Sequence, residues 1–282
     1  MSQRPNYRNV FFTFARNSLV RDMTFRGNFL LECVSSVSWV LMNVGFYLLI
    51  FLYSKQNGLG SGWREYEFFV FLSTTYFINS LIQAFFMPNA QEFSELIRTG
   101  GLDFALVKPI DTQFLISLHR VSWSSLANFG SGAVLLTYSL FHLTTRAENP
   151  LQLTVLQVVL YPVYILCGVA ILYSLMLSLS ATSVWLGRNQ SLNNFWFYIT
   201  NFSRYPMEIY SGNLAGDVLQ ITFTFAIPVL VVVNVPARLM AKPFSAQEWP
   251  LVGFALVATA ASLLASRWVF RRALLSYRSA SS

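Results

Sequence analysis

The chain has 282 residues, of which 55% are hydrophobic and 11% are charged, with a mean hydropathy of +0.50 and a net charge of +7. Soluble domains carry about 25% charged residues, so the composition excludes an ordinary soluble domain and predicts an all-α, polytopic membrane protein. The basic residues gather at the ends of apolar runs, which is typical of topology determinants and argues against nucleic acid as a partner.

Seven apolar runs follow one another along the chain, and a membrane-spanning helix needs about 20 apolar residues. The last of the weaker runs, 218–236, is interrupted by two prolines. We expect six transmembrane helices, at 29–53, 65–87, 114–142, 152–184, 191–205 and 250–270.

The charge distribution fixes the parity of these spans. With both termini cytoplasmic and six crossings, thirteen of the nineteen basic residues fall inside, including the clusters at both chain ends. An odd number of crossings would place one cluster outside, against the positive-inside bias. One weak run therefore does not cross the membrane.

The segment 206–240 is the one expected to enter the membrane from the outer side and return as a re-entrant hairpin. Its prolines and glycines break the backbone, which is tolerated at membrane depth only where protein or water covers it. In the alternative, 191–205 lies flat on the inner face and 218–236 crosses. The residues expected to shape the hairpin are Arg204, Tyr205, Pro206, Gly212, Pro228 and Pro236.

The connection 88–113 between the second and third spans is longer and more specifically helical than a connector needs to be. Phe93, Leu96 and Ile97 share one helix face, and Glu95 and Arg98 are spaced for an i,i+3 ion pair. Gly100 and Gly101 then end this helix. Although a solvated connector is possible, the pattern favours a docking element for a cytoplasmic partner or a helix in the membrane interface.

A second short helix follows in the same connection. Asp103 favours its start, Lys108 favours its end and Pro109 terminates it, while Asp111 is a good N-cap for the third span. Its apolar face, with Leu102, Ala105 and Leu106, is expected to meet either a partner or the membrane surface.

These residues carry a resemblance to a known family. The pattern formed by Arg98, Gly100, Leu102, Asp103, Leu106, Lys108, Pro109 and Ile110 resembles the first cytoplasmic loop of type-two ABC exporter permeases, in particular an antibiotic-exporter-like sub-group with six spans. The stretches RYPMEIYSG (204–212), IP (227–228) and VPARLM (235–240) resemble the outer hairpin of that family. The doubled Gly100-Gly101 departs from the family, in which an acidic residue often follows the glycine.

The resemblance implies the membrane subunit of an ATP-driven exporter in a bacterial inner membrane. Two permease subunits, identical or related, would form the pathway, and two separate ABC ATPase subunits would bind ATP and Mg. Segment 8–27 would be an interfacial helix, and 92–111 would be the coupling region. The implied ATPase-coupling residues are Glu92, Phe93, Leu96, Arg98, Gly100, Gly101, Leu102, Asp103, Leu106, Lys108 and Pro109.

Few residues suggest other chemistry. The chain has no phosphate-binding Gly-x-x-x-x-Gly-Lys-[Ser/Thr] motif, so we expect no cofactor on this chain and no ATPase activity of its own. His119 and His142 are isolated, which predicts no metal site. Intramembrane amides would either bond neighbouring helices or line a path for an amphipathic or lipid-like substrate; the candidates for such a path are Asn43, Asn79, Gln83 and Asn128.

Two other kinds of membrane protein compete with the exporter. An ion-coupled secondary transporter more often carries acidic residues in mid-membrane and an internal repeat, neither of which the sequence displays. A non-transporting scaffold would not need a specified docking loop.

Overall fold

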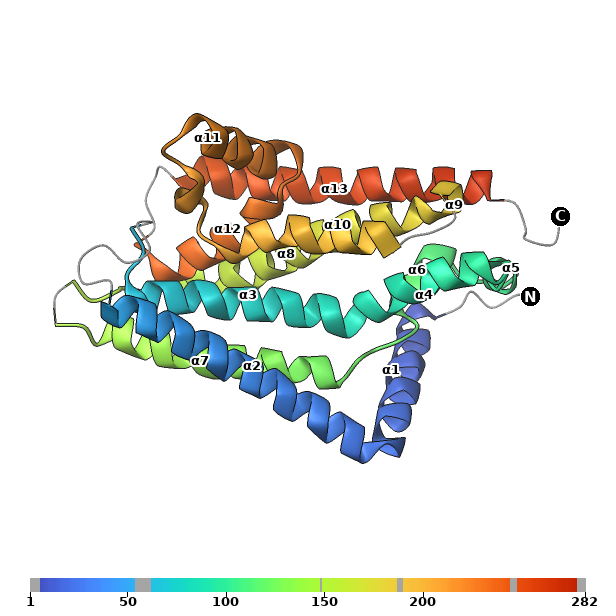
Figure 1. Cartoon of the computed structure of the whole chain (residues 1–282), viewed down its shortest axis with the longest axis horizontal. Coiled ribbons are helices and arrows are strands. Elements are labelled where there is room, and N and C mark those ends of the chain that lie inside the picture. Colours follow the sequence, from blue (N-terminus) through green and yellow to red (C-terminus); the bar gives the residue numbers. More distant parts are fainter. Residues whose placement is uncertain (1–5, 54–61, 148, 187–189, 244–247, 278–282) are drawn as a thin grey trace.

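The computed structural model describes residues 6–53, 62–147, 149–186, 190–243 and 248–277, and every regular element in this part of the chain is helical (Figure 1). The long helices run side by side, and α1 begins and α13 ends toward the end of the bundle that holds α5, which we call the α5 end. The opposite end, which includes Trp63 and Leu151, is the Trp63 end. The helices are α1 (Tyr7–Thr24), α2 (Arg26–Tyr53), α3 (Glu65–Phe85), α4 (Met87–Arg98), α5 (Leu102–Leu106), α6 (Thr112–Leu118), α7 (Ala127–Thr144), α8 (Val155–Ala181), α9 (Ser183–Leu186), α10 (Gln190–Asn201), α11 (Leu214–Ile221), α12 (Val229–Ala241) and α13 (Trp249–Ser276).

Four of the described helical stretches are long and apolar enough to cross a membrane, and the chain is therefore a multi-pass membrane protein. They are Arg26–Tyr53, Glu65–Arg98, Val155–Leu186 and Trp249–Ser276. They contain or overlap the predicted spans 29–53, 65–87, 152–184 and 250–270.

The predicted span 191–205 corresponds mainly to α10, which has only 12 residues. A helix of this length rises about 18 Å, less than the thickness of a hydrocarbon core.

The predicted span 114–142 is not one continuous helix. It is divided into α6, an irregular stretch at 119–123, a short 3₁₀ turn at Ser124–Leu126, and α7. The run His119-Arg120-Val121-Ser122 has one apolar residue, the buried Val121, and Ser122 bonds locally, with its Oγ 2.9 Å from Ser125 Oγ.

The backbone of this break is bonded by other parts of the protein. The buried Asn89 side chain donates to Arg120 O at 2.8 Å and accepts from Arg120 N at 2.9 Å, while Ser122 N donates to Ala84 O at 2.8 Å. From α1, the Ser18 hydroxyl accepts from Val121 N at 3.1 Å. The break is therefore part of the folded structure, and hydrogen bonds from α1, α3 and α4 stabilise it.

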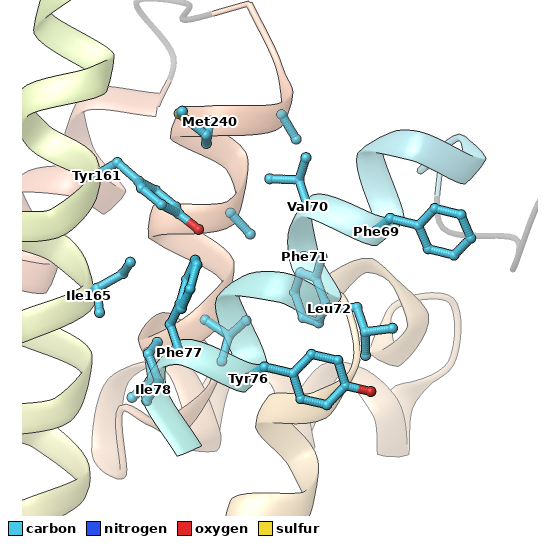
Figure 2. Close-up of a cluster of buried hydrophobic side chains, with 14 of the residues drawn as sticks. Phe69, Val70, Phe71, Leu72, Tyr76, Phe77, Ile78, Tyr161, Ile165 and Met240 are labelled. Atoms are coloured by element: carbon cyan, nitrogen blue, oxygen red, sulfur yellow. The ribbon is translucent and has the colours of Figure 1, made fainter. Parts of the chain in front are cut away.

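Helix α3 forms the centre of the bundle. Fourteen of its residues are buried, and it packs against α7, α8 and α12. Its apolar side chains point in all directions, which is typical of a helix surrounded by protein. Figure 2 shows Val70, Phe71 and Phe77 of α3 near Tyr161 of α8 and Met240 of α12. Helix α2, by contrast, buries only Val40 and Tyr47.

The stretch from α11 to α12 is a sharply bent pair. A π-helix at Thr222–Ala226 continues α11, and the axis turns by 86° before α12 begins at Val229. The last turn of α12 lies at the Trp63 end, since the Gln157 side chain donates to Leu239 O at 2.9 Å and Lys242 Nζ lies 3.4 Å from Gly62 O. The bend lies deeper, beside Ile171 and Ser174 of α8.

A close approach between α8 and α12 depends on one glycine. Pro236 has no N–H to donate to Val232 O, four residues earlier, and this carbonyl faces Gly168 of α8. A Cβ atom at Gly168 would lie 2.8 Å from Val232 O and 3.1 Å from Ile78 Cδ1. The two helices therefore approach at a point where only glycine fits.

Gly168→Ala is expected to destabilise the protein by about 1–3 kcal/mol, since the added methyl forces the backbones apart. The measurement is the thermal unfolding midpoint of the full chain in detergent. Gly45→Ala in α2 is the matched control, because nothing lies within 4 Å of its Cβ position, and it should leave the midpoint unchanged or slightly raised. Equal midpoints for Gly168→Ala and the parent protein would contradict the close approach.

Candidate functional site

The two short helices predicted in the connection 88–113 are present as α4 and α5. Helix α4 ends at Arg98, and Gly100 follows with a φ of 73°, a conformation that glycine adopts without strain. Helix α5 has one and a half turns and ends before Pro109. The Asp111 carboxylate caps α6 by accepting from Phe114 N at 3.0 Å. The stops and caps predicted from the sequence are thus confirmed.

One face of this segment is buried in the protein. Leu102 is 0% exposed, Phe93 is 1% exposed and Ala105 is also buried. They belong to one apolar cluster with residues of α6, α8 and α13, namely Leu115, Ile116, Leu177, Ala181, Phe270 and Ala273. The expectation that Leu102 and Ala105 face a partner or the membrane is wrong, because these side chains anchor α5 to the bundle.

The opposite face presents apolar side chains to the outside. Phe104 is 79% exposed and Val107 is 84% exposed, while Leu106 is partly exposed. Lys108 and Pro109 lie beside them on the surface. We call Phe104 and Val107, the C-cap residue of α5, the α5 knob; neither is among the predicted coupling residues.

The remaining predicted coupling residues lie on α4 and at the start of α5. Arg98 pairs with Glu95 through Arg98 Nε at 2.9 Å, which confirms the predicted i,i+3 pair. Glu92 accepts from Arg120 at 2.7 Å and lies 3.5 Å from His119. Leu96, Gly101 and Asp103 are half-buried. A Cβ atom at Gly101 would lie 2.9 Å from Leu96 Cδ2, so the second glycine allows α5 to turn back on α4.

An ion pair joins this segment to the last helix. Arg267 of α13 binds Asp111 through both guanidinium Nη atoms, at 2.6 and 3.2 Å. The hydrogen bond from Arg267 holds the pKa of Asp111 below its ordinary value. Asp111 N also donates to the Tyr7 hydroxyl at 3.3 Å. The start of α6 is therefore connected to both α1 and α13.

A second set of bonds extends the connection into α8. Gln113 accepts from Arg267 and donates to the Tyr173 hydroxyl at 3.0 Å, and Ser117 Oγ lies 2.8 Å from the same hydroxyl. Arg267 lies within the predicted span 250–270 and was not predicted to contact the connection 88–113. Its position inside an apolar run was the available signal that it needed a partner.

The predicted hairpin residues occupy several environments. Pro206 is buried, Arg204 and Tyr205 are exposed, and Gly212 has a φ of 112°. Pro228 stands at the bend and Pro236 inside α12.

Two hairpin contacts were not foreseen. Asn234, which is 0% exposed, accepts from Met207 N at 2.9 Å, and Arg238 pairs with Glu208 at 2.5 Å. These bonds hold the stretch before α11 against α12.

The four amides predicted to line a pathway lie on three helices. Asn43 of α2 donates to Trp39 O of its own helix at 2.8 Å. Asn79 and Gln83 are on α3, where Gln83 is exposed, and the half-buried Asn128 begins α7. Their role in transport stays a prediction.

The fold and this anchored segment define a helical membrane protein with a structured connection at one end of its bundle. Comparison with protein families identifies its family. The model of a family described as ABC-2 family transporter protein matches residues 39–281. The chain belongs to this family, whose members are membrane subunits that associate with ABC ATPases. Neither the comparison with curated proteins nor that with solved structures gave a match.

Arg267→Gln is expected to lower the stability of the α5 end by about 1 kcal/mol or less, because both partners keep about a third of their side-chain surface exposed and water screens the pair. Since the folded pKa of Asp111 is depressed, this contribution is present above about pH 4, the ordinary carboxyl range, and disappears as the pH falls through the folded pKa.

The measurement is the unfolding midpoint in detergent at pH 7 and at decreasing pH. The difference between the parent protein and Arg267→Gln should shrink as the pH falls below about 4. Arg271→Gln, at an exposed position of the same helix, is the control. A difference that does not change with pH would contradict the role of the ion pair.

Proposed function

We propose that this chain is the permease subunit of an ATP-driven ABC exporter that moves an amphipathic or lipid-like substrate outward. Two ABC ATPase subunits, which bind ATP and Mg, dock at the α5 end, and a second permease subunit, identical or related, completes the pathway. The observation that carries the proposal is the α5 knob, two exposed apolar side chains on a helix whose other face is anchored in the bundle.

The anchoring supports a coupling role for this segment. A force on Phe104 or Val107 acts on α5, which shares an apolar cluster with α6, α8 and α13. The pair between Asp111 and Arg267 adds a polar connection to α13. A helix fixed in this way can transmit different contacts with an ATPase into different arrangements of the long helices.

The orientation in the membrane follows from charge and from the course of the chain. We assign the α5 end and both termini to the cytoplasmic side of a bacterial inner membrane. Six crossings result if α6 and α7 form one broken span and α10 with its following turns forms another. The pair of α11 and α12 then enters from the outer side and returns, which agrees with the position of Lys242 next to Gly62.

The competing functions differ in their requirements. An ion-coupled transporter would function without an ATPase, and a scaffold would bind partners without turnover. Co-purification with ATPases encoded by neighbouring genes, together with ATP hydrolysis that depends on this chain, separates both from the exporter.

Replacement of the α5 knob, Phe104→Ala with Val107→Ala, is expected to weaken association with the ATPase about tenfold or more, since aromatic anchors dominate interfaces of this kind. Affinity between the purified chain and its ATPase measures the effect. Phe141→Ala is the matched control, because Phe141 is 63% exposed but lies on α7 toward the Trp63 end. Unchanged affinity and unchanged ATP hydrolysis in the double variant would refute the proposed docking surface.

Cysteine labelling tests the orientation of the hairpin. In a background with Cys33 and Cys167 replaced, Ser211→Cys should react with a membrane-impermeant maleimide only from the outer side, since Ser211 is exposed just before α11. Lys108→Cys, at the α5 end, should react only from the inside. Labelling of both positions from the inside would favour the alternative in which 218–236 crosses the membrane.

A further inference from the structure

A cavity of mixed charge lies at the elbow where α1 turns into α2. Phe25 is the C-cap of α1 and Arg26 begins α2. The cavity has a volume of about 190 Å³, far above the roughly 10–15 Å³ needed to hold one water. Its lining consists of Arg21, Asp22, Phe25, Asn28, Phe29 and Glu32.

Both carboxylates of the cavity are held in place mainly by neutral donors. Asp22 Oδ2 accepts from Trp123 N at 3.3 Å, and Glu32 accepts from Asn28 at 2.7 Å and from the Ser124 hydroxyl at 2.6 Å. Each carboxylate oxygen has two lone pairs, so acceptor capacity is left toward the cavity. The geometry of the two acids is thus fixed before any ligand arrives.

The single cation of the cavity is loosely held. Arg21 Nε lies 3.7 Å from Asp22 Oδ1, beyond hydrogen-bond distance, and the side chain of Arg21 is 46% exposed. Its guanidinium can therefore turn to bind an anionic group, for which its fork of N–H donors is suited. Two fixed carboxylates and one adjustable guanidinium give the lining a net charge of −1.

This charge pattern selects among possible ligands. The two acids disfavour a free phosphate, and Arg21 weakens the attraction of the lining for a divalent cation. Moreover, in the described ranges no three His, Cys, Asp or Glu side chains form a group that could hold a metal. A ligand with a primary ammonium and a phosphate, separated by a short linker, matches both the acids and the guanidinium, and its three N–H donors suit the free lone pairs.

The place of the cavity in the fold indicates the source of such a ligand. The next two turns of α2 expose Leu30, Leu31 and Val34, each at 61–68%, and α2 is one of the membrane-spanning helices. Acyl chains of a lipid bound at the elbow would lie along this apolar surface. The exposed Phe25 ring stands at the same level, where aromatic side chains favour the boundary between membrane and water.

We propose that the cavity between α1 and α2 binds the headgroup of a phospholipid with a primary ammonium, such as phosphatidylethanolamine. The ammonium is held by Asp22 and Glu32 and the phosphate by Arg21. Because Glu32 also binds Ser124, next to the break between α6 and α7, an occupied cavity fixes α1, α2 and the break relative to one another. This site depends on the membrane location of the chain and not on its transport activity.

Native mass spectrometry of the full chain in detergent, titrated with phosphatidylethanolamine, phosphatidylcholine or phosphatidylglycerol, tests the site. One phosphatidylethanolamine should bind about tenfold more tightly than the other two lipids. Glu32→Gln and Asp22→Asn should remove this preference. Arg21→Gln should weaken the binding of phosphatidylethanolamine and of phosphatidylcholine to the same extent. Arg16 is exposed on α1 outside the cavity, so the Arg16→Gln variant should bind the lipids as the parent protein does.

Two outcomes would overturn the proposal. Equal binding of the three lipids, or a preference that survives both acid-to-amide variants, would show that the cavity does not select an ammonium. Displacement of the lipid by water-soluble glycerophosphoethanolamine at an equal concentration would show that the ligand is a free phosphoethanolamine compound and not a membrane lipid. Thermal unfolding of each variant without added lipid shows whether it is folded.

Discussion

The need to bond every backbone group away from water governs this structure. Lipid offers no partners, so irregular backbone within a membrane protein must be covered by other protein groups. The break at 119–123 meets this need with the Asn89 side chain, Ala84 O and the Ser18 hydroxyl. The carbonyl of Val232, deprived of its helical donor by Pro236, lies against Gly168. The bond from Val121 N to the Ser18 hydroxyl thereby connects α1 to the break.

The same constraint explains why one end of the bundle is so interconnected. Once α1 covers the break, its Tyr7 hydroxyl reaches Asp111 N, and Asp111 binds Arg267 of α13. Four elements, α1, α6, α8 and α13, thus meet around the segment that carries α5. The exposed knob of α5 is therefore the outermost part of a connected unit, and a partner that contacts it acts on all these helices.

Features that depend on neighbouring residues were predictable from the sequence. The glycine after α4, the Asp111 cap and the pair of Glu95 with Arg98 all follow from local rules, and so did the four long apolar helices. Features that depend on residues far away in the chain were not predictable. The run 114–142 is apolar enough to suggest one helix, and its break is stabilised by partners from α1, α3 and α4. Likewise, the apolar pattern of α5 did not reveal that Leu102 faces inward and Phe104 outward.

Helix α2 differs from α3 in how little of its surface other parts of the protein cover. Helix α3 is enclosed by protein, whereas α2 buries only Val40 and Tyr47. Its contacts include the bond from Ser124 to Glu32 near the elbow, packing along α7, and the packing of Tyr47 on Phe68, with ring centroids 4.7 Å apart. The polar contact coincides with the mixed-charge cavity, because Glu32 belongs to the lining of that cavity. A ligand at the elbow would therefore act on the contact of α2 with the break and, through α1, on the unit around α5.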